Sequence, residues 1–182
     1  MDFENHKLIF FDDKILDNEV NIEVMMNWEN EMMFEHAKAI CKNGGDILEI
    51  GFGMGISANY IQSYNIRSHT IMEIHPQILE KLYLWKKDKP NIKIIEGDWF
   101  SNLDKLERYD GIFFDTFHDK NSHTIDILVN YLKEEGIFSF YNSLMNNNNY
   151  KLDCEYKNIE ITPTKNNYNN KKKYSIPIYI KK

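Results

Sequence analysis

Two carboxylates, Glu29 and Asp115, stand among apolar residues, where an acidic side chain is costly unless something neutralises it. Asp115 ends the apolar segment 111–114, and Glu29 shares the spacing of apolar residues on a predicted helix face. The chain has only two arginines, Arg67 and Arg108, so few of its groups could clamp a carboxylate through paired hydrogen bonds. A planar guanidinium would match two converging carboxylates. The pattern favours a site for a cationic ligand, and the alternative is a local lysine partner for Glu29 and backbone contacts for Asp115.

Three glycines, at positions 51, 53 and 55, follow Glu49 at the end of an apolar segment. Such a turn lets the backbone approach a ligand closely at the carboxyl edge of a sheet. Glu73 ends the next apolar segment, where an acidic side chain commonly binds ribose hydroxyls. Asp98 and Trp99 follow the third, where a carboxylate and an indole could bind an adenine. These features at successive strand ends predict a nucleoside site, and the alternative is a tight turn with surface acids.

The segments that position these residues alternate between apolar runs typical of strands and amphipathic runs typical of helices. The predicted strands are residues 46–50, 69–74, 92–96, 109–115 and 137–142, and the predicted helices between them are 56–63, 77–87 and about 124–133. This alternation indicates a parallel sheet covered on both faces. A longer helix is predicted at residues 20–41, because apolar residues recur there at steps of three and four (Ile22, Met25, Met26, Met33, Ala37 and Ile40).

The alternation of predicted strands and helices stops after residue 142. Residues 152–161 and 174–180 have the composition of strands, and only the polar run 164–173 separates them, which predicts an antiparallel hairpin at one edge of the sheet. The 182 residues suit a single domain. We divide it into an N-terminal region (1–45), a core (46–142) and the C-terminal hairpin (151–182).

The composition disfavours several classes of protein. The 22 basic residues against 28 acidic ones give a net charge of −6, which argues against a globally basic nucleic-acid binder. No apolar run approaches the roughly 20 residues of a transmembrane helix, and the first residues lack the order of a signal peptide. Two lone cysteines form neither a disulfide framework nor a metal cluster. We expect a soluble, cytoplasmic protein with no metal site and neither a nucleic acid nor a membrane as partner.

Three segments resemble the guanidino N-methyltransferases, the family of guanidinoacetate methyltransferase and arginine δ-N-methyltransferase. They are V-M-M-N-W-E at residues 24–29, L-E-I-G-F-G-M-G at 48–55 and D-G-I-F-F-D-T-F at 110–117. The resemblance implies an α/β, Rossmann-like class I methyltransferase fold with a mostly parallel seven-stranded sheet. It also implies S-adenosylmethionine as the cofactor and S-adenosylhomocysteine as the product.

The same resemblance implies roles for individual residues. Glu29 and Asp115 would grip the guanidinium, and Asp115 would take its proton. The residues expected to bind the cofactor are Glu49, Gly51, Gly53, Gly55, Glu73, Asp98 and Trp99. The further residues expected near the substrate are Met26, Trp28 and Thr116, with the backbone amides of Ser143 and Leu144 holding a substrate carboxylate.

The sequence thus predicts transfer of a methyl group to a guanidino nitrogen. The substrate would be arginine, free or in a peptide, or a small guanidino compound such as guanidinoacetate. Two alternatives stay open, a class I methyltransferase for another amine or a nucleic acid, and a non-catalytic subunit that binds the cofactor and regulates another enzyme. The sequence also leaves a homodimer open.

Overall fold

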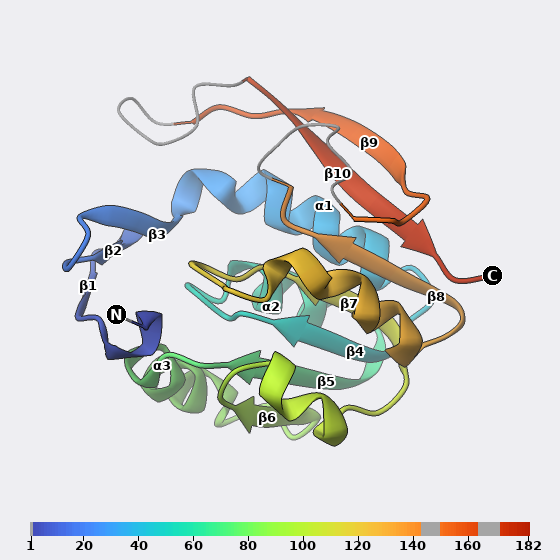
Figure 1. Cartoon of the computed structure of the whole chain (residues 1–182), viewed down its shortest axis with the longest axis horizontal. Helices are drawn as coiled ribbons and strands as arrows, with labels where there is room; N and C mark the ends of the chain where they lie inside the picture. Colours follow the sequence, from blue (N-terminus) through green and yellow to red (C-terminus); the bar gives the residue numbers. More distant parts are fainter. Residues whose placement is uncertain (1, 143–149, 164–171) are drawn as a thin grey trace.

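The computed structural model describes residues 2–142, 150–163 and 172–182. A seven-stranded sheet crosses the molecule in the order β6-β5-β4-β7-β8-β10-β9 (Figure 1). Its parallel strands are β4 (Gly45–Ile50), β5 (Ile66–Glu73), β6 (Ile92–Glu96), β7 (Tyr109–Phe114) and β8 (Leu132–Phe140). β10 (Lys173–Ile180) runs antiparallel to β8 and to the edge strand β9 (Glu155–Glu160). The α/β class and the mostly parallel sheet with an antiparallel C-terminal hairpin are confirmed.

The predicted helix at residues 20–41 is wrong in its first part. Residues 22–26 form strand β3 (Ile22–Met26), which pairs with β2 (Lys14–Asp17), and β2 pairs with β1 (Leu8–Phe10) in a small antiparallel sheet. A 3₁₀ turn, η2 (Asn27–Glu29), follows, and the helix α1 begins only at Asn30 and runs to Ile40. The apolar spacing of residues 22–26 fits a half-buried strand as well as a helix, and pairing with β2 decides between them.

Helices cover both faces of the large sheet. The helices α1, α2 (Ile56–Ser63) and α3 (Pro76–Lys86) lie on one face, where the core includes Met33, Ile61, Ile71 and Leu82. On the other face lie two 3₁₀ helices, η3 (Phe100–Lys105) and η4 (Ser122–Tyr131), against a core that includes Leu48, Ile112 and Phe138. The predicted helix 56–63 is confirmed, and 77–87 is shifted by one residue. The predicted helix 124–133 is a 3₁₀ helix that begins and ends two residues earlier, so that residues 132–133 belong to β8. None of the described helices is long and apolar enough to cross a membrane.

Candidate active site

A cavity of about 410 Å³ lies at the carboxyl ends of β4, β5, β6 and β7, where ligands bind in open α/β sheets. The short N-terminal helix η1 (Phe3–Asn5) and strand β3 contribute to its wall. Its acidic lining residues are Asp2, Glu4, Glu23, Glu29, Glu73, Asp98, Asp115 and Asp119. Among the described lining residues Lys120 is the only lysine or arginine, and its ammonium pairs with Asp2. The electrostatics of this cavity therefore favour a cationic ligand.

The glycine turn after β4 forms one wall of the cavity. Gly51 has a φ of +92°, and a Cβ at this position would overlap the carbonyl oxygen of Asp115. A glycine is needed here because only glycine combines this φ with so close an approach between the two strand ends. Gly51 and Gly53 line the cavity, whereas Gly55 caps the start of α2 with a φ of +73° and is not among the lining residues.

Glu73 links the glycine turn to the end of β5. Its carboxylate accepts hydrogen bonds from the backbone N–H groups of Phe52 (2.9 Å), Ile74 (2.9 Å) and His75 (2.8 Å), and it lines the cavity. Burial raises the pKa of Glu73, and the backbone N–H donors oppose that rise. The side chain thus fixes the shape of this wall and presents a carboxyl group to the cavity.

Asp98 and Trp99 lie at the end of β6, as predicted, and both line the cavity. The Asp98 carboxylate accepts a hydrogen bond from the backbone N–H of Ser101 at 2.8 Å. The indole of Trp99 is 3% exposed, and its Nε1 donates to Asp119 at 2.6 Å. Trp99 also packs edge-to-face on Phe114, with ring centroids 5.3 Å apart. These contacts fix the indole, so its orientation is set before any ligand arrives.

Asp115 lines the cavity directly after β7. Its backbone N–H donates to the carbonyl oxygen of Ile50 at 2.9 Å, which sets the chain beside the glycine turn. Burial raises the pKa of the Asp115 carboxyl to about 7, with a further contribution from the negative charge of Glu49. A carboxyl group with such a pKa is suited to accept a proton near neutral pH.

Glu29 reaches the same cavity from the other side, through the 3₁₀ turn before α1 rather than from a helix face. Its side chain is buried, and Oε1 accepts a hydrogen bond from the backbone N–H of Met26 at 2.9 Å. The structure therefore brings together the two carboxylates singled out in the sequence. Thr116 also lines the cavity, and its hydroxyl donates to Asp119 at 3.1 Å.

Other predicted site residues lie elsewhere. Glu49 is not among the residues that line the cavity; its carboxylate is fully buried, 3.0 Å from Nε2 of His69, and accepts from the Ser57 hydroxyl. Met26 and Trp28 are not among the residues that line the cavity, because Met26 packs into the core and Trp28 packs against it. Ser143 and Leu144 lie outside the described residues.

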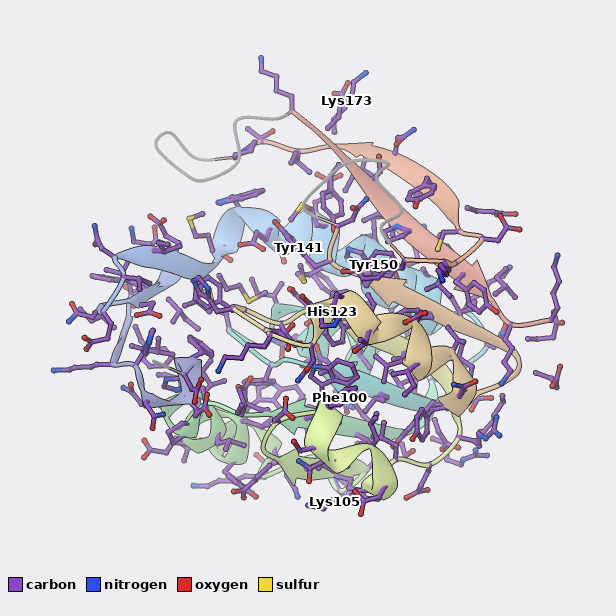
Figure 2. The ribbon with its side chains drawn as sticks, viewed as in Figure 1. Phe100, Lys105, His123, Tyr141, Tyr150 and Lys173 are labelled. Carbon is purple, nitrogen blue, oxygen red and sulfur yellow. The ribbon has the colours of Figure 1, made fainter. Side chains whose placement is uncertain are left out.

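Several lining residues were missed in the sequence. Tyr141 follows the end of β8 at the same sheet edge, and it is labelled in Figure 2. The strand-end rule that predicted Asp115 could have found it. Asp119 lies four residues beyond Asp115, and only its hydrogen bonds to Trp99 and Thr116 reveal its place. The sequence indicated neither the small N-terminal sheet, through which β3 reaches the cavity, nor the short helix η1, which contributes Phe3.

The sequence matches one protein family and a set of similar proteins. A family model described as guanidinoacetate N-methyltransferase matches residues 11–170. Proteins named protein arginine N-methyltransferase 2 are similar in sequence. That of Kluyveromyces lactis is 34% identical over 85% of this chain and 45% of its own length, and that of Candida glabrata is 36% identical over 86% and 41%. The chain thus spans less than half the length of these relatives.

Solved structures show the same fold at low sequence identity. Spermidine synthase from Thermotoga maritima superposes with a TM-score of 0.65 and 15% identity, over 97% of this chain and 72% of that chain. The N-methyltransferase NodS from Bradyrhizobium japonicum gives 0.62 and 14%, over 85% and 96%. The predicted Rossmann-like class I methyltransferase fold is confirmed.

Proposed function

The chain belongs to the guanidinoacetate N-methyltransferase family, and we propose that it transfers a methyl group from S-adenosylmethionine to a guanidino nitrogen. The substrate would be arginine, free or in a peptide, or a small guanidino compound such as guanidinoacetate. One observation carries the proposal. Glu29 and Asp115 line the same acidic cavity, beside a glycine turn that suits a nucleoside. The names of the relatives, protein arginine N-methyltransferase 2, support the arginine side chain as substrate.

The residues present fit S-adenosylmethionine, which the family and the fold support as the cofactor. Gly51 and Gly53 leave this wall of the cavity as backbone without side chains, which a ligand can approach closely. Glu73 and Asp98 would bind the polar groups of the nucleoside, and Trp99 would pack against its base. The acidic lining would also stabilise the positive charge of a sulfonium. When bound, this cofactor supplies an electrophilic methyl group.

Glu29 and Asp115 would have different roles toward the substrate. Glu29 would accept hydrogen bonds from the guanidinium and fix its plane, because a buried carboxylate beside a planar cation forms charge-assisted hydrogen bonds. A guanidinium has a pKa above ~12 and no free lone pair, so one nitrogen must lose a proton as it attacks. Asp115 would accept that proton at its carboxylate. Holding the nitrogen in line with the methyl group would supply much of the rate acceleration.

A methylation assay tests this function. The protein is incubated with radiolabelled S-adenosylmethionine and arginine, guanidinoacetate, agmatine or an arginine-containing peptide, and the product is separated from the cofactor. We expect labelled guanidino product from at least one of them. Asp115→Asn should lower methyl transfer by orders of magnitude while S-adenosylhomocysteine binds as before. The matched control is Asp104→Asn, because Asp104 is exposed on η3. Binding of the cofactor without product from any of the four would refute the assignment.

We further infer that residues 1–182 act as one methyltransferase domain in the cytoplasm. Both cysteines, Cys41 and Cys154, are free thiols, which supports a reducing compartment. The homodimer left open by the sequence is tested by light scattering of the purified chain.

A further inference from the structure

A cluster of buried polar side chains lies where α1, β8 and β10 meet. His36 and Ser139 are fully buried, and Tyr174 is 2% exposed. Each comes from a different element, with His36 on α1, Ser139 on β8 and Tyr174 on β10. None of the three lines the cavity, so the chemistry proposed above does not use them directly. Buried polar groups of this kind cost free energy unless each finds a partner.

One end of the cluster has a fixed hydrogen-bond direction. The hydroxyl oxygen of Ser139 lies 2.6 Å from the carbonyl oxygen of Pro177, which can only accept, so the hydroxyl donates to it. Nδ1 of His36 lies 2.7 Å from the same hydroxyl oxygen. Because the hydroxyl has only one proton, Nδ1 must donate to Ser139.

The hydrogen-bond direction at the other end of the cluster is fixed as well. Burial lowers the pKa of His36 to about 3, so the imidazole is neutral and its Nε2 carries no proton. The Tyr174 hydroxyl lies 3.1 Å from Nε2 and therefore donates to it. The same hydroxyl accepts the backbone N–H of Asn142 at 2.6 Å. Every donor in the chain from Asn142 through Tyr174, His36 and Ser139 to Pro177 thus has one acceptor, and the order cannot be reversed.

This chain of hydrogen bonds ends beside the candidate active site. Asn142 follows Tyr141, whose side chain lines the cavity and whose ring lies 5.8 Å from that of Tyr174. At the other side, His36 belongs to α1, and α1 begins directly after Glu29. Burial raises the pKa of Tyr174 well above its ordinary value, and the negative charges of Asp115 and Glu29 add to the rise. The phenol therefore stays protonated at neutral pH.

We propose that Tyr174, His36 and Ser139 are positioning residues for the guanidino substrate. Their hydrogen bonds hold the start of α1, with Glu29, and the backbone of residues 141–142 in one arrangement around the cavity. The C-terminal hairpin thereby takes part in substrate positioning, because β10 supplies both Tyr174 and the carbonyl group of Pro177. This inference rests on the methyl transfer proposed above.

The variant Tyr174→Phe tests the role in positioning. It removes the hydroxyl that joins Asn142 to His36 and keeps the ring. We expect kcat/KM for the guanidino substrate that gives product to fall at least tenfold, while the Kd for S-adenosylhomocysteine stays within twofold. The matched control is Tyr109→Phe, because Tyr109 is equally buried at the start of β7 and its hydroxyl accepts, among the described residues, a single long hydrogen bond of 3.5 Å from the N–H of Glu107. This control should leave both quantities within twofold.

Three results of this test would overturn the proposal. They are a kcat/KM of Tyr174→Phe within twofold of wild type, an equal loss in Tyr109→Phe, and a loss of S-adenosylhomocysteine affinity as large as the loss of kcat/KM. The last two would indicate a general effect on folding.

A second measurement needs neither a variant nor activity. Nitrogen NMR of the wild-type imidazoles should show His36 as the neutral tautomer protonated at Nδ1 from pH 5 to pH 9. A proton on Nε2, or a charged ring in that range, would contradict the assigned direction. Because this measurement is independent of turnover, it separates a failure of the hydrogen-bond chain from a failure of the proposed methyl transfer.

Discussion

Asp115 should destabilise the free protein above neutral pH. Its pKa is about 7 in the folded chain against an ordinary value of 3.8, and burial is the main cause. At about 1.36 kcal/mol per pKa unit, this difference corresponds to at most about 4 kcal/mol of unfolding free energy. The contribution of Asp115 to stability is fully present below pH 4. It falls as the pH rises towards 7, because the unfolded chain releases the proton there and the folded chain keeps it.

The variant Asp115→Asn measures this effect, because asparagine has nearly the same shape and no titrating proton. Urea unfolding is followed without ligands at pH 5, 6, 7 and 8 for wild type, for Asp115→Asn and for the control Asp104→Asn. The free energy of unfolding of Asp115→Asn minus that of wild type should grow by about 1.4 kcal/mol per pH unit between pH 5 and 7. It should level off above pH 7, after a total rise of about 2–3 kcal/mol.

The refuting result is a difference that stays constant from pH 5 to pH 8. It would mean that water in the cavity solvates the Asp115 carboxylate well enough to leave its pKa near the ordinary value. The difference for Asp104→Asn should not follow this course, because that side chain is exposed. Groups other than Asp115 titrate in both proteins and cancel in the difference between them.

Three further predictions concern the site itself. The kcat/KM for the guanidino substrate should rise about tenfold per pH unit below pH 7 and level off above it, because Asp115 must be unprotonated to accept a proton. A kcat/KM that stays constant from pH 5 to 8 would exclude Asp115 as the proton acceptor. Glu29→Gln should raise the substrate KM roughly 10–100-fold, as expected for a lost charge-assisted contact. It should leave S-adenosylhomocysteine binding within twofold in calorimetry. The exposed control Glu31→Gln on α1 should change neither quantity. Gly51→Ala should abolish S-adenosylhomocysteine binding and lower the midpoint of thermal unfolding, because its Cβ would overlap the Asp115 carbonyl oxygen. Normal affinity for S-adenosylhomocysteine in this variant would show that the turn can adapt.

The sequence predicted several residues of the cavity because strand ends obey a simple rule. Parallel strands bring their carboxyl ends to one edge, so residues that follow successive strands must meet there. Glu73, Asp98 and Asp115 were found in this way, and all three line the cavity. The rule says nothing about the direction of each side chain. Glu49 lies one residue before the end of β4, but its carboxylate contacts His69, and this contact depends on packing between β4 and β5.

The N-terminal region shows what a periodic pattern leaves undetermined. Apolar residues at 22, 25 and 26 fit a helix that continues into α1, and they fit a strand that pairs with β2. The pairing is a contact between segments, so no local pattern reveals it. Glu29 was nevertheless singled out correctly as a buried acid, although it is buried in the 3₁₀ turn η2 and not on the helix face from which its burial was predicted.

The unfavourable environment of Asp115 also bears on how a substrate would be selected. A neutral ligand leaves about half of the carboxyl groups protonated at pH 7 and most of them at pH 6, and a protonated carboxyl cannot take the proton of an attacking nitrogen. A guanidinium favours the ionised form, lowers the pKa of Asp115 and relieves the cost of keeping a carboxylate in this cavity. A guanidino substrate therefore promotes the ionisation of Asp115, the group that is to accept its proton. Binding of a guanidino substrate should release protons from Asp115 at pH 6, and calorimetry in buffers of different ionisation enthalpy would detect the release in wild type and lose it in Asp115→Asn.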